Sequence, residues 1–204
     1  MKKVLTCLLA LTLVLTCVFA MTACGEQEEP KKESEAEDTS SAEDTSSTEE
    51  TVSTPKEYVL AEGYKPFGTS ALSFAYPKDW TLTDSDNPVM ADDQGNSVNL
   101  VSETANDQNT ELYTSLSQDT FMELMGNVFE AMGMDIGAYS VEKKTNDQGV
   151  EMVVCTYSLT YQEIEMTMTQ FILVGEKNHY TITVTAVTDI DEVTAEVFKS
   201  ITLK

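Results

Sequence analysis

The sequence predicts an α+β fold in which helices pack on the faces of a central antiparallel sheet. Apolar residues recur at helical spacing over residues 117–132, and a second helical stripe follows from residue 189. Between them, four stretches from residue 138 to residue 187 are typical of strands, and the turns that join them are short. Strands joined by short turns lie antiparallel, so the pattern indicates helices packed on an antiparallel sheet.

Short strands open the predicted domain. Residues 72–77, Leu-Ser-Phe-Ala-Tyr-Pro, alternate apolar and small side chains and stop at a proline, which indicates a strand. Residues 80–83 are predicted to form a second strand after the Lys78-Asp79 turn. The turn at residues 92–96 predicts short strands on both of its sides, at 89–91 and 97–102.

The first predicted helix covers residues 117–132. Its start has two candidate caps: Ser115 and Gln118 have the spacing of a capping box, and Ser117 could serve equally well. Gly133 is the predicted stop. The apolar stripe consists of Phe121, Leu124, Met125, Val128 and Met132, with Phe129 beside it.

Four strands are predicted after this helix, at residues 138–145, 150–161, 165–174 and 179–187. Their turns, at residues 146–149, 162–163 and 175–178, are short enough to make a meander. The longest strand carries apolar residues on both faces, with Val153 on one face and Val154 on the other. Both faces of the sheet are therefore expected to be covered.

The last predicted helix starts at Asp189, which is spaced from Glu192 like a capping pair. Residues 200–203 are predicted to form a short extended tail. The apolar stripe of this helix consists of Ile190, Val193, Val197 and Phe198.

The N-terminus has the pattern of a secretory signal at residues 1–23. Two lysines precede an uncharged apolar run over residues 4–19, which is too short for a stable membrane span. Small residues then precede Cys24. This pattern fits either ordinary signal-peptide cleavage or lipidation of that cysteine. Residues 21–25, Met-Thr-Ala-Cys-Gly, resemble the lipobox of bacterial lipoproteins, although Met21 stands where that family most often has leucine. The resemblance implies cleavage between Ala23 and Cys24 and lipidation of Cys24.

Residues 24–57 are predicted to be a disordered acidic tether. They consist mainly of Glu, Asp, Ser, Thr and Lys, and the run Ala-Glu-Asp-Thr-Ser-Ser at 36–41 repeats at 42–47. Such a segment has too few apolar side chains to offset the entropy of ordering. We interpret it as a spacer between the membrane and one domain at residues 58–204.

The charge of the domain argues against a nucleic-acid partner. Residues 58–204 hold 23 acids, 7 lysines and no arginine, a formal charge of −16. A surface this acidic repels phosphate backbones, and the absence of arginine removes bidentate recognition of phosphate and guanine. Cys155 is the one cysteine of this range, so the domain has no internal disulfide.

A family resemblance starts at residues 74–80, Phe-Ala-Tyr-Pro-Lys-Asp-Trp. This run resembles the aromatic-x-Tyr-Pro-x-x-Trp signature that opens PsbP-like domains, and the order of predicted elements is similar over most of residues 68–204. The resemblance implies an α/β/α sandwich and a non-catalytic, protein-binding role. Within the fold we expect Pro77 to end a strand and Trp80 to pack back onto the core.

The side chains best suited to chemical reactions are expected to have structural roles. His179, the one histidine of the chain, lies at a predicted turn, and the sequence contains no G-x-S-x-G motif whose serine it could activate. We therefore expect His179 to be a plain hairpin residue. Cys155 lies in the middle of a strand, which predicts a buried, inert thiol. Soft thioethers bind Cu(I), but these methionines fall on predicted apolar stripes and are expected to be core: Met122, Met125, Met132, Met134, Met166 and Met168.

These observations predict a lipid-anchored, extracytoplasmic, non-catalytic binding module without a cofactor. We expect it on the outer face of a bacterial, Gram-positive membrane, held through Cys24, with an envelope protein or a peptide as its partner. One alternative is a metal-dependent hydrolase, because a predicted loop region gathers acids whose oxygens suit calcium, although their spacing is not that of an EF-hand. These acids are Asp84, Asp86, Asp92 and Asp93. A purely structural surface protein is the other alternative.

Overall fold

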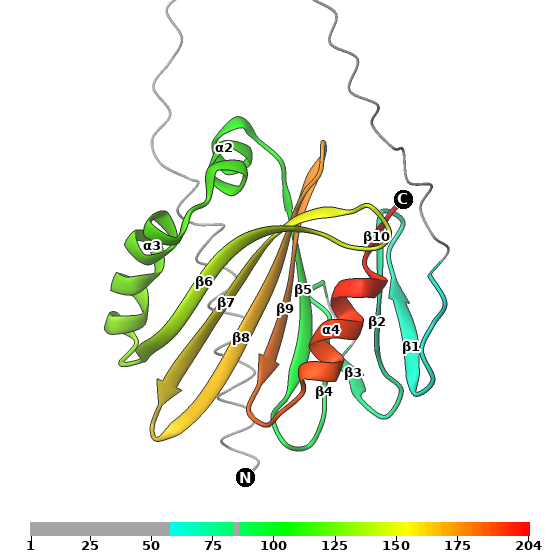
Figure 1. Cartoon of the computed structure of the whole chain (residues 1–204), viewed down its shortest axis with the longest axis horizontal. Helices are drawn as coiled ribbons and strands as arrows, with labels where there is room; N and C mark the ends of the chain where they lie inside the picture. Colours follow the sequence, from blue (N-terminus) through cyan, green and yellow to red (C-terminus); the bar gives the residue numbers. More distant parts are fainter. Residues whose placement is uncertain (1–57, 84–85) are drawn as a thin grey trace, which may run out of the picture.

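Seven antiparallel strands form the main sheet of the computed structural model, which describes residues 58–83 and 86–204 (Figure 1). Cys24, the predicted tether and Asp84 lie outside these residues. The last four strands of this sheet along the chain form the predicted meander, and the strand Ser97–Thr104 pairs with the last of them. In spatial order the strands are β3 (Thr81–Thr83), β4 (Val89–Ala91), β5 (Ser97–Thr104), β9 (Asn178–Ala186), β8 (Ile164–Val174), β7 (Glu151–Tyr161) and β6 (Asp135–Thr145).

A second, three-stranded sheet holds the strand predicted at residues 72–77. This strand, β2 (Leu72–Pro77), lies between β1 (Tyr64–Gly68) and β10 (Thr202–Leu203). Strand β1 was not predicted, because its Pro66 weakens the strand pattern and proline is confined to edge strands. The predicted C-terminal tail supplies β10, so the two ends of the domain meet in one sheet.

Both faces of the main sheet are covered, as the two apolar faces of β7 predicted. One face, which includes Val153 and Tyr157, packs against α3 (Gln118–Ala131). The other face, which includes Val154, packs against β2 and α4 (Asp191–Ser200). Figure 1 shows α4 beside the small sheet, away from α3. The α+β prediction, with helices on the faces of an antiparallel sheet, is confirmed.

A helix that the sequence analysis did not predict, α2 (Asp107–Ser115), precedes α3. Its N-terminus is closed by a capping box, in which the side chains of Asn106 and Asn109 each accept a backbone N–H from the other residue. Its sequence is mostly polar and buries only Asn109 and Tyr113, so it carries no apolar stripe that would have revealed it.

The ends of α3 decide between the two caps that the sequence left open. Ser117 is the N-cap, and its hydroxyl accepts the backbone N–H of Thr120 at 3.2 Å, whereas Ser115 ends α2. Gly133 has a φ of +69° and follows the last helical residues, as predicted. The Met134 N–H donates to the Phe129 carbonyl at 2.9 Å, which completes a Schellman motif.

Strand β6 starts at Asp135, three residues earlier than predicted, and contains an irregularity between Ile136 and Tyr139. Gly137 lies in this stretch, where an added Cβ would come within 2.3 Å of the Ser158 hydroxyl oxygen. Glycine weakens the sequence pattern of a strand, so the start of β6 was not predicted. In the folded domain these residues pair with β7.

The N-cap of helix α4 lies one residue later than predicted. Its N-cap is Ile190, which makes no side-chain capping bond, and Asp189 instead accepts the Asp191 N–H at 3.2 Å. At its other end, the Asn146 amide donates to the carbonyls of Phe198 and Ile201 at 3.0 and 2.8 Å. The β6–β7 turn therefore holds the C-terminus of α4 by satisfying carbonyls that the helix leaves open.

Candidate functional site

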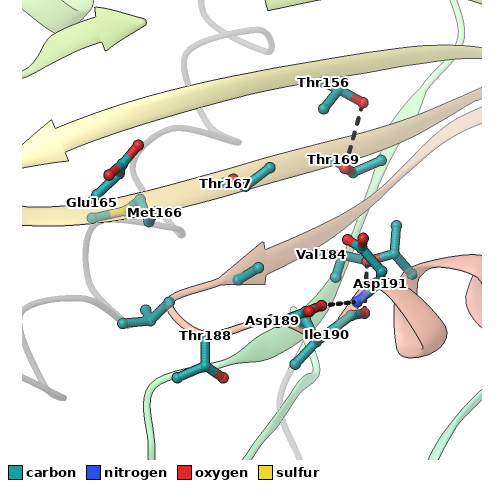
Figure 2. A pocket seen from close by; sticks show the side chains of 13 residues that line it. Thr156, Glu165, Met166, Thr167, Thr169, Val184, Thr188, Asp189, Ile190 and Asp191 are labelled. Carbon is teal, nitrogen blue, oxygen red and sulfur yellow. Dashed lines mark hydrogen bonds between the residues drawn. The ribbon is translucent and has the colours of Figure 1, made fainter. Parts of the chain in front are cut away.

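A groove beside the N-terminus of α4 is the candidate site (Figure 2). Its volume is about 400 Å³, within the range of small-molecule pockets. The floor is the α4-side face of β7, β8 and β9, and the wall is the β9–α4 loop with the first turn of α4. Its lining includes Thr156, Glu165, Thr167, Thr169, Val184, Ala186, Thr188, Asp189, Ile190, Asp191 and Thr194.

The register of the sheet places hydroxyls and methyl groups together on the floor. Thr156 lies opposite Thr169, and Thr169 lies opposite Val184, so one rung crosses three strands. The hydroxyl oxygens of Thr156 and Thr169 are 3.5 Å apart, a weak hydrogen bond. Because alternate side chains of a strand share a face, Thr167 lies on the same floor beside Thr169, and its side chain is exposed.

Three exposed carboxylates, those of Glu165, Asp189 and Asp191, surround the floor. Asp189 and Asp191 flank the N-terminus of α4, where the helix dipole favours negative charge. Within the described part of the chain, none of the three forms an ion pair. The rim of the groove is therefore negatively charged.

A buried asparagine holds the wall of the groove in place. Asn96 is 2% exposed, and its side-chain oxygen accepts the backbone N–H groups of Val187 and Thr188 at 2.9 and 3.1 Å. Its amide donates to the Asp92 carboxylate at 2.7 Å and to the Thr188 hydroxyl at 2.8 Å. One side chain thus ties the β4–β5 turn to the β9–α4 loop.

The groove brings polar and aliphatic side chains together. Its hydroxyls and carboxylates can orient a ligand, and its methyl groups and aliphatic residues can cover apolar parts of that ligand. Over residues 58–83 and 86–204, no group of three or more His, Cys, Asp or Glu side chains is arranged to hold a metal ion.

Among the described acids that the sequence singled out, Asp92 has a structural role in its own turn. One carboxylate oxygen of Asp92 accepts three backbone N–H groups of its own turn, from Gln94, Gly95 and Asn96. Its other oxygen accepts the Asn96 amide, so Asp92 is a turn residue. Asp86 lines a separate cavity near Ser102, and Asp93 is exposed. The structure does not bring the described members of this group together.

His179 is an interior residue that joins α2 to the main sheet. It is 1% exposed, its Nε2 is 2.9 Å from the Thr110 hydroxyl, and its ring meets Tyr113 edge-on at 5.5 Å. Tyr113 donates a hydrogen bond to Glu103, which lies opposite His179 in the sheet. His179 therefore has a role in packing that the sequence, which predicted a plain hairpin residue, did not reveal.

The burial of His179 predicts a pH-dependent stability. Burial lowers the pKa of His179 below its ordinary value near 6.5, and the nearby Glu103 opposes this shift only in part. Because the folded state binds the proton less readily than the unfolded state, stability is full above that ordinary value and is lost as pH falls through the folded pKa. Urea unfolding from about pH 7.5 to about pH 5.5 should show this loss.

The matched control is His179→Phe, which keeps a ring beside Tyr113 and removes the only imidazole of the chain. This variant is expected to be less stable than the wild type but to show a flat profile over the same pH range. Equal slopes for the two proteins would contradict the assignment to His179.

The cysteine and methionine predictions are confirmed. Cys155 is fully buried, and burial raises the pKa of its thiol to about 12, so the thiolate is scarce near neutral pH. The methionines on the predicted stripes lie in or against the core on the α3 side of the sheet: Met122, Met125, Met132, Met134, Met166 and Met168.

The motif at residues 74–80 is also structural. Pro77 ends β2, and Phe74, Tyr76 and Trp80 are buried together on the α4 side of the main sheet. Lys65 lies over the ring of Tyr76, 4.8 Å from its centroid, and donates to the Lys78 carbonyl at 2.8 Å. The spacing of Phe74, Tyr76 and Trp80 in the motif is explained by their shared burial in this cluster.

Comparison with known proteins shows a likeness of fold. No protein-family model and no curated protein matches the chain. The solution structure of cyanobacterial PsbP (CyanoP) from Synechocystis sp. PCC 6803 is similar with a TM-score of 0.55 and 13% identity, over 72% of this chain and 95% of that one. The domain has the PsbP-like fold that the motif predicted.

Two further solved structures are more distantly similar. A crystal structure from Bacteroides thetaiotaomicron VPI-5482 has a TM-score of 0.47 and 12% identity, over 70% of this chain and 49% of that one. LpqN, involved in cell envelope biogenesis of Mycobacterium tuberculosis, has a TM-score of 0.40 and 11% identity, over 69% of this chain and 90% of that one.

Proposed function

We propose that this chain is a bacterial lipoprotein, anchored through Cys24 at the outer face of a Gram-positive membrane, whose domain binds an envelope protein or a peptide without catalysing a reaction. The main support for a non-catalytic role is the burial of the two side chains best suited to catalysis near neutral pH. The one imidazole of the chain and the one thiol of its domain, His179 and Cys155, are both buried within packing contacts.

The groove beside α4 supports the binding part of the proposal. It is open and is lined by hydroxyls, carboxylates and aliphatic side chains, which bind ligands by contact and hydrogen bonding. The metal-dependent alternative has less support, because the Asp92 carboxylate is occupied by its own turn. The lipobox resemblance and the acidic spacer support an anchored domain held away from the membrane.

Replacing Cys24 by Ser should abolish membrane attachment, because serine has no thiol to receive the diacylglycerol. In the described part of the chain, no helix has the length and apolar character needed to cross a membrane. The measurement is membrane fractionation of cells with metabolic acyl labelling. Wild-type protein should be labelled and sediment with membranes, and the Cys24→Ser protein should be unlabelled and either soluble or uncleaved.

The control is Cys155→Ser, which changes the one thiol of the domain and should keep the acyl label. Unlabelled wild-type protein in the soluble fraction would refute the lipoprotein assignment. For the binding role, crosslinking in intact cells should recover an envelope protein or peptide with the wild type and lose it when the groove is blocked. Turnover of a substrate by the purified domain would contradict the non-catalytic assignment.

A further inference from the structure

We infer that the groove beside α4 binds a lysine or arginine side chain of a protein partner. This inference rests on the proposed function and names the chemistry of its partner. Glu165, Asp189 and Asp191 line the groove without an ion pair in the described part of the chain, and none of the lining residues is a lysine. A cationic group is therefore the complement of this rim.

The distribution of charge favours a long side chain over a bare ion. The carboxylates do not gather into a group that could hold a metal in the described residues, and they stand around a floor of mixed character. Lysine and arginine bury an aliphatic stem along apolar surface and keep the charged head in polar surroundings. Here the stem would lie along the partly exposed Ala186 and Ile190, with the head near the carboxylates of the rim.

The floor and wall supply further hydrogen-bond acceptors to the charged head. The hydroxyls of Thr156, Thr167 and Thr169 lie on the floor, and each can accept a bond from an ammonium or guanidinium. Asn96 keeps the wall in one position by bonding two backbone groups of the β9–α4 loop. Such a site is formed before the partner arrives, which lowers the entropic cost of binding.

The test measures fluorescence anisotropy of a labelled peptide of alternating lysine and alanine, added to the full-length protein in detergent micelles at about 0.15 M salt. The groove variant is the triple change Glu165→Gln, Asp189→Asn and Asp191→Asn. It should weaken binding about ten-fold, because each exposed ion pair contributes a few-fold and three are removed. Acetylation of the lysines should abolish binding to the wild type.

A charge-matched control separates the groove from the general acidity of the protein. The triple change Glu111→Gln, Glu123→Gln and Glu130→Gln removes the same charge from exposed positions on α2 and α3. It should change binding less than about two-fold, because screening limits the reach of exposed charges. Thr167→Trp fills the floor and keeps every carboxylate, and it should also weaken binding.

Several results would overturn the inference. The two triple changes could weaken binding equally, or the groove change or Thr167→Trp could have no effect. The acetylated peptide could bind, or the unmodified peptide could fail to bind the wild type. Displacement of the peptide by an equal concentration of spermidine would identify a free polyamine and exclude a protein partner. Unfolding curves confirm that each variant is folded. The peptide assay does not depend on Cys24. Peptide binding can therefore be absent while acyl labelling confirms lipidation, and peptide binding can be present while labelling is absent.

Discussion

Replacing Phe121 by Ala should lower the free energy of unfolding by about 3–5 kcal/mol, because it opens a cavity in a packed interior. Phe121 is fully buried on α3, and its ring centroid lies 5.1 Å from that of Tyr157 on β7 and 6.5 Å from that of Tyr139 on β6. One side chain thus joins the helix to two strands. For a domain of this size the loss corresponds to a fall of roughly 10 °C in Tm.

Urea unfolding followed by circular dichroism measures this loss. Phe121→Leu keeps much of the buried volume and should cost clearly less than Phe121→Ala. Glu123→Ala, an exposed change on the same helix, should stay within about 0.5 kcal/mol of the wild type. A wild-type unfolding curve for Phe121→Ala would show that α3 does not pack on the sheet through this ring.

Replacing Asn96 by Ala should cost about 2–4 kcal/mol, because it removes a buried set of hydrogen bonds and leaves backbone groups unsatisfied. The backbone N–H groups of Val187 and Thr188 and one oxygen of the Asp92 carboxylate would lose their partner. The β9–α4 loop, which forms the wall of the groove, would lose its tie to the β4–β5 turn. Peptide binding in the groove should therefore weaken together with stability.

Two further changes make the Asn96 experiment specific. Gln94→Ala alters an exposed side chain in the same turn and keeps its backbone bond to Asp92, so it should be nearly neutral. Asn96→Asp keeps the acceptor oxygens but places a second carboxylate against Asp92, so it should cost at least as much as Asn96→Ala. Equal stability of Asn96→Ala and the wild type would show that the loop is held by other contacts.

The elements that the sequence predicted well are those whose periodicity records their burial. The stripe on α3 and the two apolar faces of β7 follow directly from which side chains must leave water. The turn at Gln162 and Glu163 was also predicted from its length, although both residues take positive φ angles of 49° and 67°. Helix α2 escaped prediction because it is polar and is held by caps and by the contacts of Tyr113.

The candidate groove was not predictable, because its residues are far apart in the chain. Thr156, Thr169 and Val184 come from three strands, and only the register of β7, β8 and β9 makes them neighbours. Asp189 stood out in the sequence only as a helix start, and Asp191 did not stand out at all. Of the acids that did stand out, Asp92 proved to be a turn residue, since a short acidic side chain shortly before a glycine is also the signal of a turn.

By itself the sequence determined the class of the fold, the formal charge of the domain and the resemblance of residues 21–25 to a lipobox. These properties are local or additive, since they depend on periodicity, composition and short motifs. The tertiary structure alone decided that residues 72–77 belong to a separate sheet, that His179 is enclosed by α2, and that threonines and carboxylates meet beside α4. Each of these depends on which distant segments pair and pack, and pairing is settled by the burial of whole faces rather than by any one residue.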